Sequence, residues 1–479
     1  MASNRAHAVM VCFHLQGHII PFVNLALKLA SKGFTITFAH LDFVHQQISK
    51  SQYNATQTDI FAAARSSGLD IRYTTFSDGH PLDFDRSVSF DQWLEIFRDE
   101  LPDKVDDLVG NILQSDSSTA PSNYFLIADT LYTWPKKIAQ KYGLVNVSFW
   151  TEPALVFSLY YHLELLRENG HVPVNGRREI VNYLPGIESI NTKDFMSYLH
   201  DTELGVLHDI MFGAFDDVKT ADFILCNTVQ DVEADTISAL QQKHPFYAIG
   251  PLFPADSANN SIAKSLLPES SSADWLNSRP PGSVLYVSFG SLAKTDKKVI
   301  LEIAGGLLLS GVNFIWVLRP GMVDSITGDG GVLPEGFEDG TRERGMVVPW
   351  CSQNEVLRNP AIGGFLTHCG WNSILESIWS GVPMICYPLF TDQITNRKLV
   401  VDDWRVGINL CDGESMSKEE VAEKIEVLMS GKRSQELRQE IQKVRTTFQN
   451  AISVGGSSDQ NFDRFVLDVS QEILRRSCH

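Results

Sequence analysis

The feature that most constrains the fold is an alternation of short apolar runs with amphipathic segments. In the first half, buried strands are predicted for HAVMVCF and FTITFAH, and an amphipathic helix that ends at Gly33 is predicted for HIIPFVNLALKLASKG between them. The pattern continues through YFLIA, LYTWPKKIAQKYG, VNVSFW, the apolar helix EPALVFSLYYHLELL, and DFILCN. This strand–helix–strand rhythm predicts a parallel sheet with helices on both faces.

A second series of the same kind follows a stretch rich in Pro, Ser, Ala and Asn. It runs through SVLYVSF, KKVILEIAGGLLLSG, FIWVLR, GMVVPW, GGFLTH, NSILESIWSG and PMICYP. We therefore expect two doubly wound, Rossmann-like α/β domains that face a cleft, with ligands at the carboxyl ends of their strands. The expected divisions are an N-terminal domain (1–247), a linker (248–273), a C-terminal domain (274–456), and a final helix (457–479) that packs back on the first domain.

Length and charge agree with two enzyme-sized domains. A chain of 479 residues exceeds one ordinary core, and its net charge of −18 argues against nucleic acid or an acidic membrane surface as a partner. Seven scattered cysteines without metal spacing indicate reduced thiols. The N-terminus resembles no signal peptide and no stretch is long enough to span a membrane, so we expect a cytoplasmic monomer.

The run THCGWNSILESI, at 367–378, places many polar and small residues where a buried strand passes into a helix. A capped turn explains part of it, with Asn372 or Ser373 as the N-cap and Glu376 in the first turn. That explanation leaves His368 and Trp371 without a function.

The run belongs to a larger segment, WCSQNEVLRNPAIGGFLTHCGWNSILESIWSGVPMICYPLFTDQ, from Trp350 to Gln393. This segment strongly resembles the signature box of plant UDP-dependent glycosyltransferases of small-molecule metabolism, and the likeness extends over essentially the whole chain. The resemblance implies the GT-B fold and binding of a UDP-sugar as co-substrate, with no resident cofactor.

The resemblance also assigns the donor site. A helix N-terminus offers backbone N–H groups and a positive dipole end to a diphosphate. By resemblance the diphosphate contacts His368, Asn372 and Ser373, and the turn SFGS closes the other side with Gly290 and Ser291. The remaining expected roles are uracil stacking for Trp350, base contacts for Cys351 and Gln353, ribose binding for Glu376, and sugar binding for Trp371, Asp392 and Gln393. Taken singly, each of these residues also fits core packing or helix capping.

A second site is predicted around His18 in LQGHIIP. By resemblance His18 is the general base that takes the proton of the acceptor hydroxyl, and Asp129 in LIADTLYTW orients and charge-stabilises it. Thr151 in FWTEP matches a family position near the sugar. Read without the resemblance, His18 and Asp129 also fit polar residues at helix starts.

Two further stretches, DFD and KTDKK, have the composition of a metal-binding or a phosphate-binding site. The DFD at 83–85 has the form of a metal-binding DxD motif, but it falls in a loop far from any phosphate motif, so we predict no metal site. The lysines of KTDKK, at 294–298, fit an exposed helix start. Aromatic and apolar residues around Trp93 and in SFWTEPALVFSLYY indicate a pocket for a bulky acceptor, although such helices are also typical of a core.

These observations predict an inverting glycosyltransferase that moves glucose from UDP-glucose to a hydroxyl of a small lipophilic plant metabolite. Gln393 favours glucose over galactose by resemblance. The alternatives are transfer of a different UDP-sugar, a UDP-sugar-binding protein without turnover, and a nicotinamide oxidoreductase. The first turn, HLQGHIIP, lacks the GxGxxG fingerprint that the oxidoreductase would need.

Overall fold

The computed structural model describes residues 5–51, 59–84, 86, 90–115, 119–200, 205–253, 270–323, 331–411, 413 and 415–478. The chain divides into two compact units. The first unit comprises Met1–Thr192, His200–Leu267 and Ala451–His479, and the second comprises Lys193–Leu199 and Pro268–Asn450. All seven cysteines are free thiols, as the sequence predicts. In the described part of the chain, no helix combines the length and apolar character needed to cross a membrane.

The first unit is built on a seven-stranded sheet whose strands are all parallel. In spatial order its strands are β3 (Ile71–Phe76), β2 (Thr35–Leu41), β1 (His7–Val11), β4 (Tyr124–Asp129), β5 (Val145–Trp150), β8 (Phe223–Cys226) and β9 (Phe246–Ala248). A separate antiparallel pair is formed by β6 (Ile180–Val181) and β7 (Ile190–Asn191).

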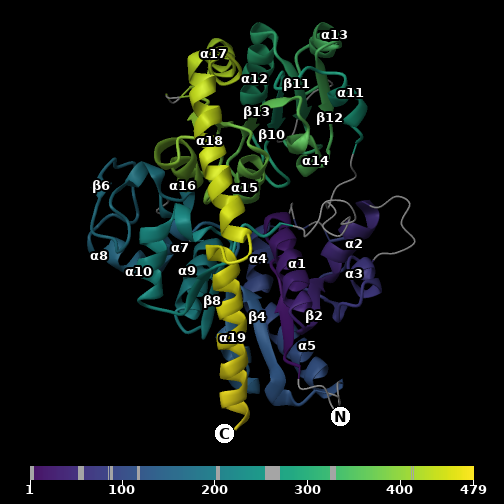
Figure 1. Cartoon of the computed structure of the whole chain (residues 1–479), viewed down its shortest axis with the longest axis vertical. Coiled ribbons are helices and arrows are strands. Elements are labelled where there is room, and N and C mark those ends of the chain that lie inside the picture. Colours follow the sequence, from purple (N-terminus) through teal and green to yellow (C-terminus); the bar gives the residue numbers. More distant parts are fainter. Residues whose placement is uncertain are drawn as a thin grey trace. The chain divides into compact units, whose positions relative to one another are not determined.

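Helices pack on this sheet, among them α1 on β2, α6 on β4 and β5, and the long C-terminal α19 on β9. Figure 1 shows α1 beside β2 and the length of α19, in yellow, up to the C-terminus. The helices of the first unit are α1 (Gln16–Ser31), α2 (Asp42–Ser51), α3 (Ala62–Ser66), α4 (Phe90–Asp99), α5 (Leu101–Ser115), η1 (Pro121–Asn123), α6 (Pro135–Tyr142), α7 (Ala154–Tyr161), α8 (Leu163–Glu168), α9 (Val206–Val218), η4 (Gln230–Val232), α10 (Ala234–Gln241) and α19 (Ser457–Ser477).

The second unit contains a six-stranded parallel sheet. Its strands, in spatial order, are β12 (Gly345–Val348), β11 (Asn313–Val317), β10 (Val284–Ser288), β13 (Ile362–Thr367), β14 (Met384–Cys386) and β15 (Gly407–Asn409). Its helices are η2 (Thr192–Asp194) at the boundary, η3 (Ser197–Leu199), α11 (Ala273–Asn277), α12 (Lys297–Ser310), α13 (Phe337–Thr341), α14 (Gln353–Arg358), α15 (Trp371–Ser380), α16 (Gln393–Lys398), the π-helix η5 (Leu399–Asp403), α17 (Lys418–Met429) and α18 (Gly431–Ile452), which runs on into the first unit.

The strand orders confirm the predicted fold of two doubly wound α/β units. In each sheet the chain starts in the middle, moves outward to one edge, and then returns to continue on the other side. The reversal creates a switch point between β1 and β4 in the first sheet and between β10 and β13 in the second. Open α/β sheets bind ligands at such points, outside the carboxyl ends of the strands.

Two predicted helices differ in the structure. The expected helix EPALVFSLYYHLELL is interrupted at His162, whose φ of −98° and ψ of 23° depart from helical values, so that α7 and α8 are separate helices. The helix predicted from LYTWPKKIAQKYG begins only at Pro135, because proline suits a first helical position, and it ends before Gly143, which has φ of 66°. Of the predicted linker, residues 254–269 lie outside the described residues.

Candidate active site

At the switch point of the first unit, a histidine and an aspartate from neighbouring strand ends meet. His18 lies in the first turn of α1, which follows β1, and Asp129 is the last residue of β4. Because β1 and β4 are adjacent and parallel, their carboxyl ends bring the two side chains together. His18 Nδ1 and Asp129 Oδ2 are 2.8 Å apart, and the other carboxylate oxygen accepts from the Leu131 amide at 3.0 Å.

This arrangement sets the chemistry of the His18 ring. Both side chains are buried, and the Thr151 hydroxyl, which follows β5, lies 3.0 Å from the same Nδ1. A nitrogen that faces a carboxylate carries a proton, so Nε2 is left as the proton acceptor. The structure thus brings His18, Asp129 and Thr151 into one cluster in the first unit.

Aromatic side chains surround the cluster. The Phe13 ring centroid lies 5.2 Å from that of His18, and Phe97 packs edge-on against Phe13 at 5.3 Å. His14 lies 4.6 Å from Trp93, and burial lowers the pKa of His14 to about 3, so its imidazole is neutral. An aromatic cluster therefore adjoins His18, and the ion pair of the buried Asp78 with Arg86 contacts it, since Asp78 accepts from Trp93 Nε1 at 3.1 Å.

At the switch point of the second unit, another histidine occupies a space that only glycine can leave open. His368 follows β13, and the turn after β10 contains Gly290. A Cβ added at Gly290 would lie 2.6 Å from His368 Nε2, and one at Gly370 would lie 2.5 Å from the same atom. Gly290 also has φ of 74°, a backbone conformation that residues other than glycine rarely adopt. Both glycines are therefore required for the histidine to approach.

Burial lowers the pKa of His368 to about 4; a hydrogen bond to the Ser288 backbone opposes this shift, and the nearby charge of Arg319 adds to it. The Arg319 guanidinium donates to the carbonyl oxygens of Gly290 and Ala293, so it fixes the turn that carries Gly290 and Ser291. The imidazole of His368 is therefore neutral at pH 7. It can offer one ring N–H to an anion without carrying a charge of its own.

The helix that follows β13 begins earlier than the sequence predicts. Its N-cap is Gly370, whose carbonyl accepts from the Ile374 amide at 3.1 Å, so Asn372 and Ser373 are in the first turn and neither is the N-cap. A larger cap would clash with His368. Glu376 correspondingly lies beyond the first turn. Asn372 and Ser373, two of the residues expected to contact a diphosphate, thus lie in the N-terminal turn of α15, at the positive end of its dipole.

A buried carboxylate lies one turn further along α15. Glu376 accepts from Gln353 Nε2 at 2.7 Å and from Asn354 Nδ2 at 3.2 Å, and Gln353 also donates to the Ser373 hydroxyl at 2.9 Å. Burial raises the pKa of Glu376 to about 7 despite these hydrogen bonds. The group is suited to accept hydrogen bonds from hydroxyls when it is ionised.

The residues expected at the base lie on the segment between β12 and α14. Trp350 and Cys351 are both buried, and the Trp350 carbonyl accepts from the Ser270 amide at 2.9 Å. The Tyr286 hydroxyl donates to Gln353 Oε1 at 3.3 Å, and Gln353 Nε2 donates to Ser373 and Glu376.

Asp392 and Gln393 lie at the start of α16. Asp392 accepts from the Thr391 hydroxyl at 2.7 Å and from Asn396 Nδ2. Gln393 Oε1 accepts from the amides of Leu389 at 3.0 Å and Phe390 at 3.2 Å, so its Nε2 is the group left to contact a ligand. Trp371 is buried, with Trp404 5.9 Å from its ring.

Sequence reasoning missed three polar residues of the second unit. Asn396 lies four residues after Asp392, so helical spacing could have indicated it. Asn354 directly follows the predicted Gln353, and that spacing places the two on different sides of a helix, so it gave no such signal. Arg319 had no such signal, because the strand end that carries it lies 29 residues beyond the Gly290 carbonyl to which it donates.

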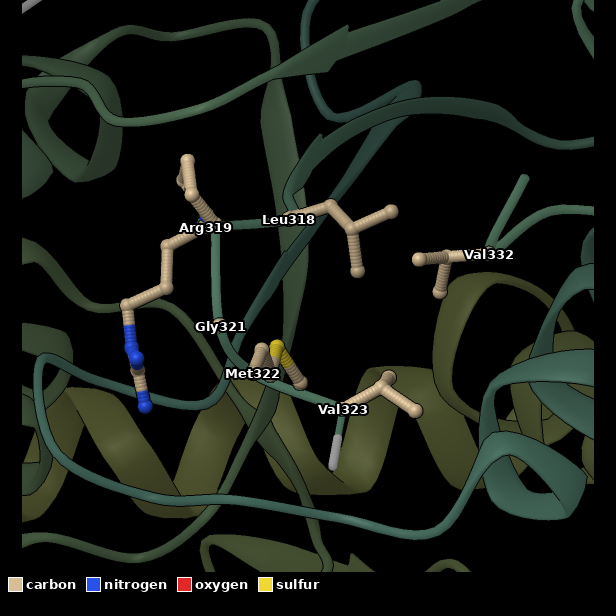
Figure 2. Close-up of a pocket in the computed structure, with 7 residues that line it drawn as sticks. Leu318, Arg319, Gly321, Met322, Val323 and Val332 are labelled. Carbon is tan, nitrogen blue, oxygen red and sulfur yellow. The ribbon is translucent and has the colours of Figure 1, made fainter. Parts of the chain in front are cut away.

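A cavity of about 330 Å³ also lies in the second unit. Its lining is mostly apolar, from Leu318, Met322, Val323 and Val332, and Figure 2 shows the Arg319 guanidinium pointing away from these side chains. The cavity includes none of the predicted site residues.

Of the DFD motif, Asp83 is exposed and Asp85 lies outside the described residues. In the described ranges, no group of three or more His, Cys, Asp or Glu side chains could hold a metal ion.

Comparison with known proteins gives matches along the whole chain. The family model of UDP-glucoronosyl and UDP-glucosyl transferases matches residues 219–443. UDP-glycosyltransferase 86A1 of Arabidopsis thaliana is 52% identical over 100% of this chain and 97% of its own length. The 7-deoxyloganetin glucosyltransferase of Gardenia jasminoides is 33% identical, over 96% of this chain and 97% of its own. The solved structure of Phytolacca americana UGT2 with UDP-2fluoro-glucose and pterostilbene is 25% identical, with a TM-score of 0.77 over 98% of this chain and 100% of its own.

Proposed function

Because the chain belongs to the UDP-glucoronosyl and UDP-glucosyl transferase family and is a glycosyltransferase with a UDP-sugar as co-substrate, we propose a specific reaction for it. In this reaction the protein transfers glucose from UDP-glucose to a hydroxyl of a small lipophilic plant metabolite. The observation that carries the proposal is the contact of 2.8 Å between His18 Nδ1 and Asp129 Oδ2.

His18 acts as the general base. An alcohol is a poor nucleophile at neutral pH, so its proton must leave as its oxygen attacks the anomeric carbon. Nε2 of His18 takes this proton, while Asp129 holds the ring by Nδ1 and stabilises the imidazolium that forms. The Thr151 hydroxyl at 3.0 Å helps to orient the ring, which is the role we assign to it in place of a direct sugar contact.

The second unit binds the leaving nucleotide. The N-terminal turn of α15 and neutral His368 bind the diphosphate, Glu376 accepts from the ribose hydroxyls, and Trp350 stacks on the uracil. Attack from the face opposite the departing UDP inverts the anomeric carbon, so an α-linked donor yields a β-glycoside. Asp392 and the Nε2 of Gln393 bind the sugar hydroxyls.

The aromatic cluster of Phe13, Trp93 and Phe97 beside His18 supports a lipophilic acceptor. The small molecules named for its relatives, 7-deoxyloganetin and pterostilbene, belong to the same general class. We assign no single acceptor, because aromatic rings recognise apolar surface in general and do not select one molecule.

The test is a transfer assay with UDP-glucose and a panel of phenolic and terpenoid acceptors. The expected product gains the mass of one hexose, and its proton NMR spectrum shows a β-linkage. A parallel set with UDP-galactose and UDP-xylose tests the donor, for which glucose should give the highest rate. Tight binding of UDP-glucose without any product, or an α-linked product, would contradict the proposal.

A further inference from the structure

A seven-residue segment that is distant in sequence from the signature box contacts the loop that carries Asp392 and Gln393. This segment, Lys193–Leu199, belongs to the second unit, although the chain on both sides of it belongs to the first. We call it the strap. Its side chains Phe195, Met196 and Leu199 are fully buried, so it is packed in place along its length.

Ser197 of the strap holds both backbone groups of Thr391. The Ser197 amide donates to the Thr391 carbonyl at 3.1 Å, and the Thr391 amide donates to the Ser197 hydroxyl at 2.9 Å. Nearby, the Thr395 hydroxyl donates to the Asp194 carbonyl at 2.7 Å, and the buried Asp194 carboxylate pairs with Arg397. The strap therefore contacts the loop before α16 and the helix itself.

The residue held in this way has an unusual backbone. Thr391 has φ of 57°, a left-handed conformation that is rare for a β-branched side chain. Conformations of this kind persist only where surrounding contacts impose them. Here the contacts are the two hydrogen bonds to Ser197.

The conformation of Thr391 determines how the next two residues are presented. The Thr391 hydroxyl donates to Asp392 Oδ1 at 2.7 Å, and Gln393 Oε1 is held by the Leu389 and Phe390 amides of the same loop. Release of Thr391 would therefore remove one of the two side-chain hydrogen bonds that hold the Asp392 carboxylate, the other being from Asn396 Nδ2, and would loosen the loop whose amides hold Gln393.

We propose that the strap is a positioning element for the donor sugar, and that Ser197 is a positioning residue that holds Thr391 so that Asp392 and Gln393 can bind the sugar hydroxyls. This inference rests on the proposed function, in which those two residues contact the sugar. The residues assigned to uracil, ribose and diphosphate lie on other segments, around Trp350 and α15. The strap should therefore affect binding of the sugar and leave binding of the nucleotide unchanged.

The test compares the affinities of the whole protein for UDP and for UDP-glucose by calorimetry. Ser197→Ala removes the acceptor of the Thr391 amide. We expect its affinity for UDP-glucose to fall about 5- to 10-fold, as the loss of one hydrogen bond would give, while its affinity for UDP stays within about twofold of the wild type. Ser197→Thr keeps the hydroxyl and should restore binding of UDP-glucose.

The matched control is Ser430→Ala, which removes a hydroxyl of the second unit that donates to the Glu426 carbonyl at 3.0 Å, far along the chain from the loop. It should change neither affinity. Unchanged binding of UDP-glucose in Ser197→Ala, or an equal loss for UDP and UDP-glucose, would overturn the inference. Wild-type protein that binds UDP-glucose but transfers no sugar would contradict the proposed function instead, and the comparison of the variants would still decide the role of the strap.

Discussion

The two units have the same kind of sheet, and each places a histidine at its switch point, but the surroundings of the two imidazoles are opposite. His18 has a buried carboxylate 2.8 Å from Nδ1. His368 has no carboxylate among the described residues within ion-pair distance and instead lies between Gly290 and Gly370, near the charge of Arg319. The difference teaches that one fold position can serve a base or an anion-binding group, depending on the residue beside the ring.

In the proposed function, the two kinds of work fall to different units. An imidazole oriented by a carboxylate can take a proton and remain stabilised as a cation. An imidazole whose pKa is lowered to about 4 stays neutral and can only share a hydrogen bond. Changes near His18 should therefore affect turnover, and changes near His368 should affect binding of the nucleotide.

The largest effect is expected from His18→Ala. Base catalysis contributes about 10²–10⁴-fold, so turnover with an aliphatic alcohol as acceptor should fall by that order. Acidic phenols, which are already partly ionised, should lose less. Steady-state rates with both acceptor types check this, and an equal loss for the two would mean that another group is the base.

A smaller or comparable loss is expected from Asp129→Asn. The amide keeps the shape of the side chain but removes the charge that stabilises the imidazolium. Because the two residues act as a unit, the double variant with His18→Ala should be little worse than His18→Ala alone. The measurement is the turnover of the wild type, the two single variants and the double variant. Losses that multiply in the double variant would show that the two residues act independently.

In the second unit, Glu376→Ala should weaken the binding of UDP about 10- to 100-fold and leave the general base, His18, unchanged. Each hydrogen bond between a hydroxyl and a carboxylate contributes about 1.5–3 kcal/mol, part of which water in the vacated space offsets. Calorimetric titration with UDP measures the change. An unaltered UDP affinity in a variant that melts like the wild type would remove Glu376 from the ribose site.

The smallest effect is a dependence on pH. Burial raises the pKa of Glu376 from 4.5 to about 7, so in the free protein this group stabilises the fold below pH 4.5, and that stabilisation is lost as the pH rises through 7. In the proposed site the ribose hydroxyls bind the ionised form of Glu376, so affinity for UDP-glucose should rise up to about tenfold between pH 6 and pH 8. Glu376→Gln cannot ionise and serves as the control.

A pH slope that persists in Glu376→Gln would assign the dependence to another group. UDP-glucose is the ligand of choice here because its diphosphate has no terminal phosphate that titrates in this range.

Much of the fold could be predicted from the sequence, because short apolar runs and glycine or proline stops carry local information. The segment HAVMVCF contains β1, and Gly33 follows α1 as expected. The start of α15 could not be predicted, because the cap preference of Asn372 was overruled by the contact between Gly370 and His368.

The candidate site shows the same division. The strand pattern places His18 and Asp129 at the carboxyl ends of strands in one parallel sheet, and the family resemblance paired them. Their contact depends on β1 and β4 being neighbours, which the structure shows. The contact between Ser197 and Thr391 joins residues 194 positions apart, with no motif at Ser197. The position of Thr151 beside His18 likewise depended on the order of strands, which sequence periodicity does not determine.

The most direct test of the central comparison is a crossed pair of variants, His18→Ala and His368→Ala, each measured for UDP affinity by calorimetry and for turnover at saturating UDP-glucose. The account predicts that His18→Ala binds UDP as the wild type does and has lost most of its turnover. His368→Ala should bind UDP at least about tenfold more weakly, because a hydrogen bond to a charged diphosphate is lost. Equal losses of UDP affinity in both variants, or an undiminished turnover in His18→Ala, would contradict the division of work between the two histidines.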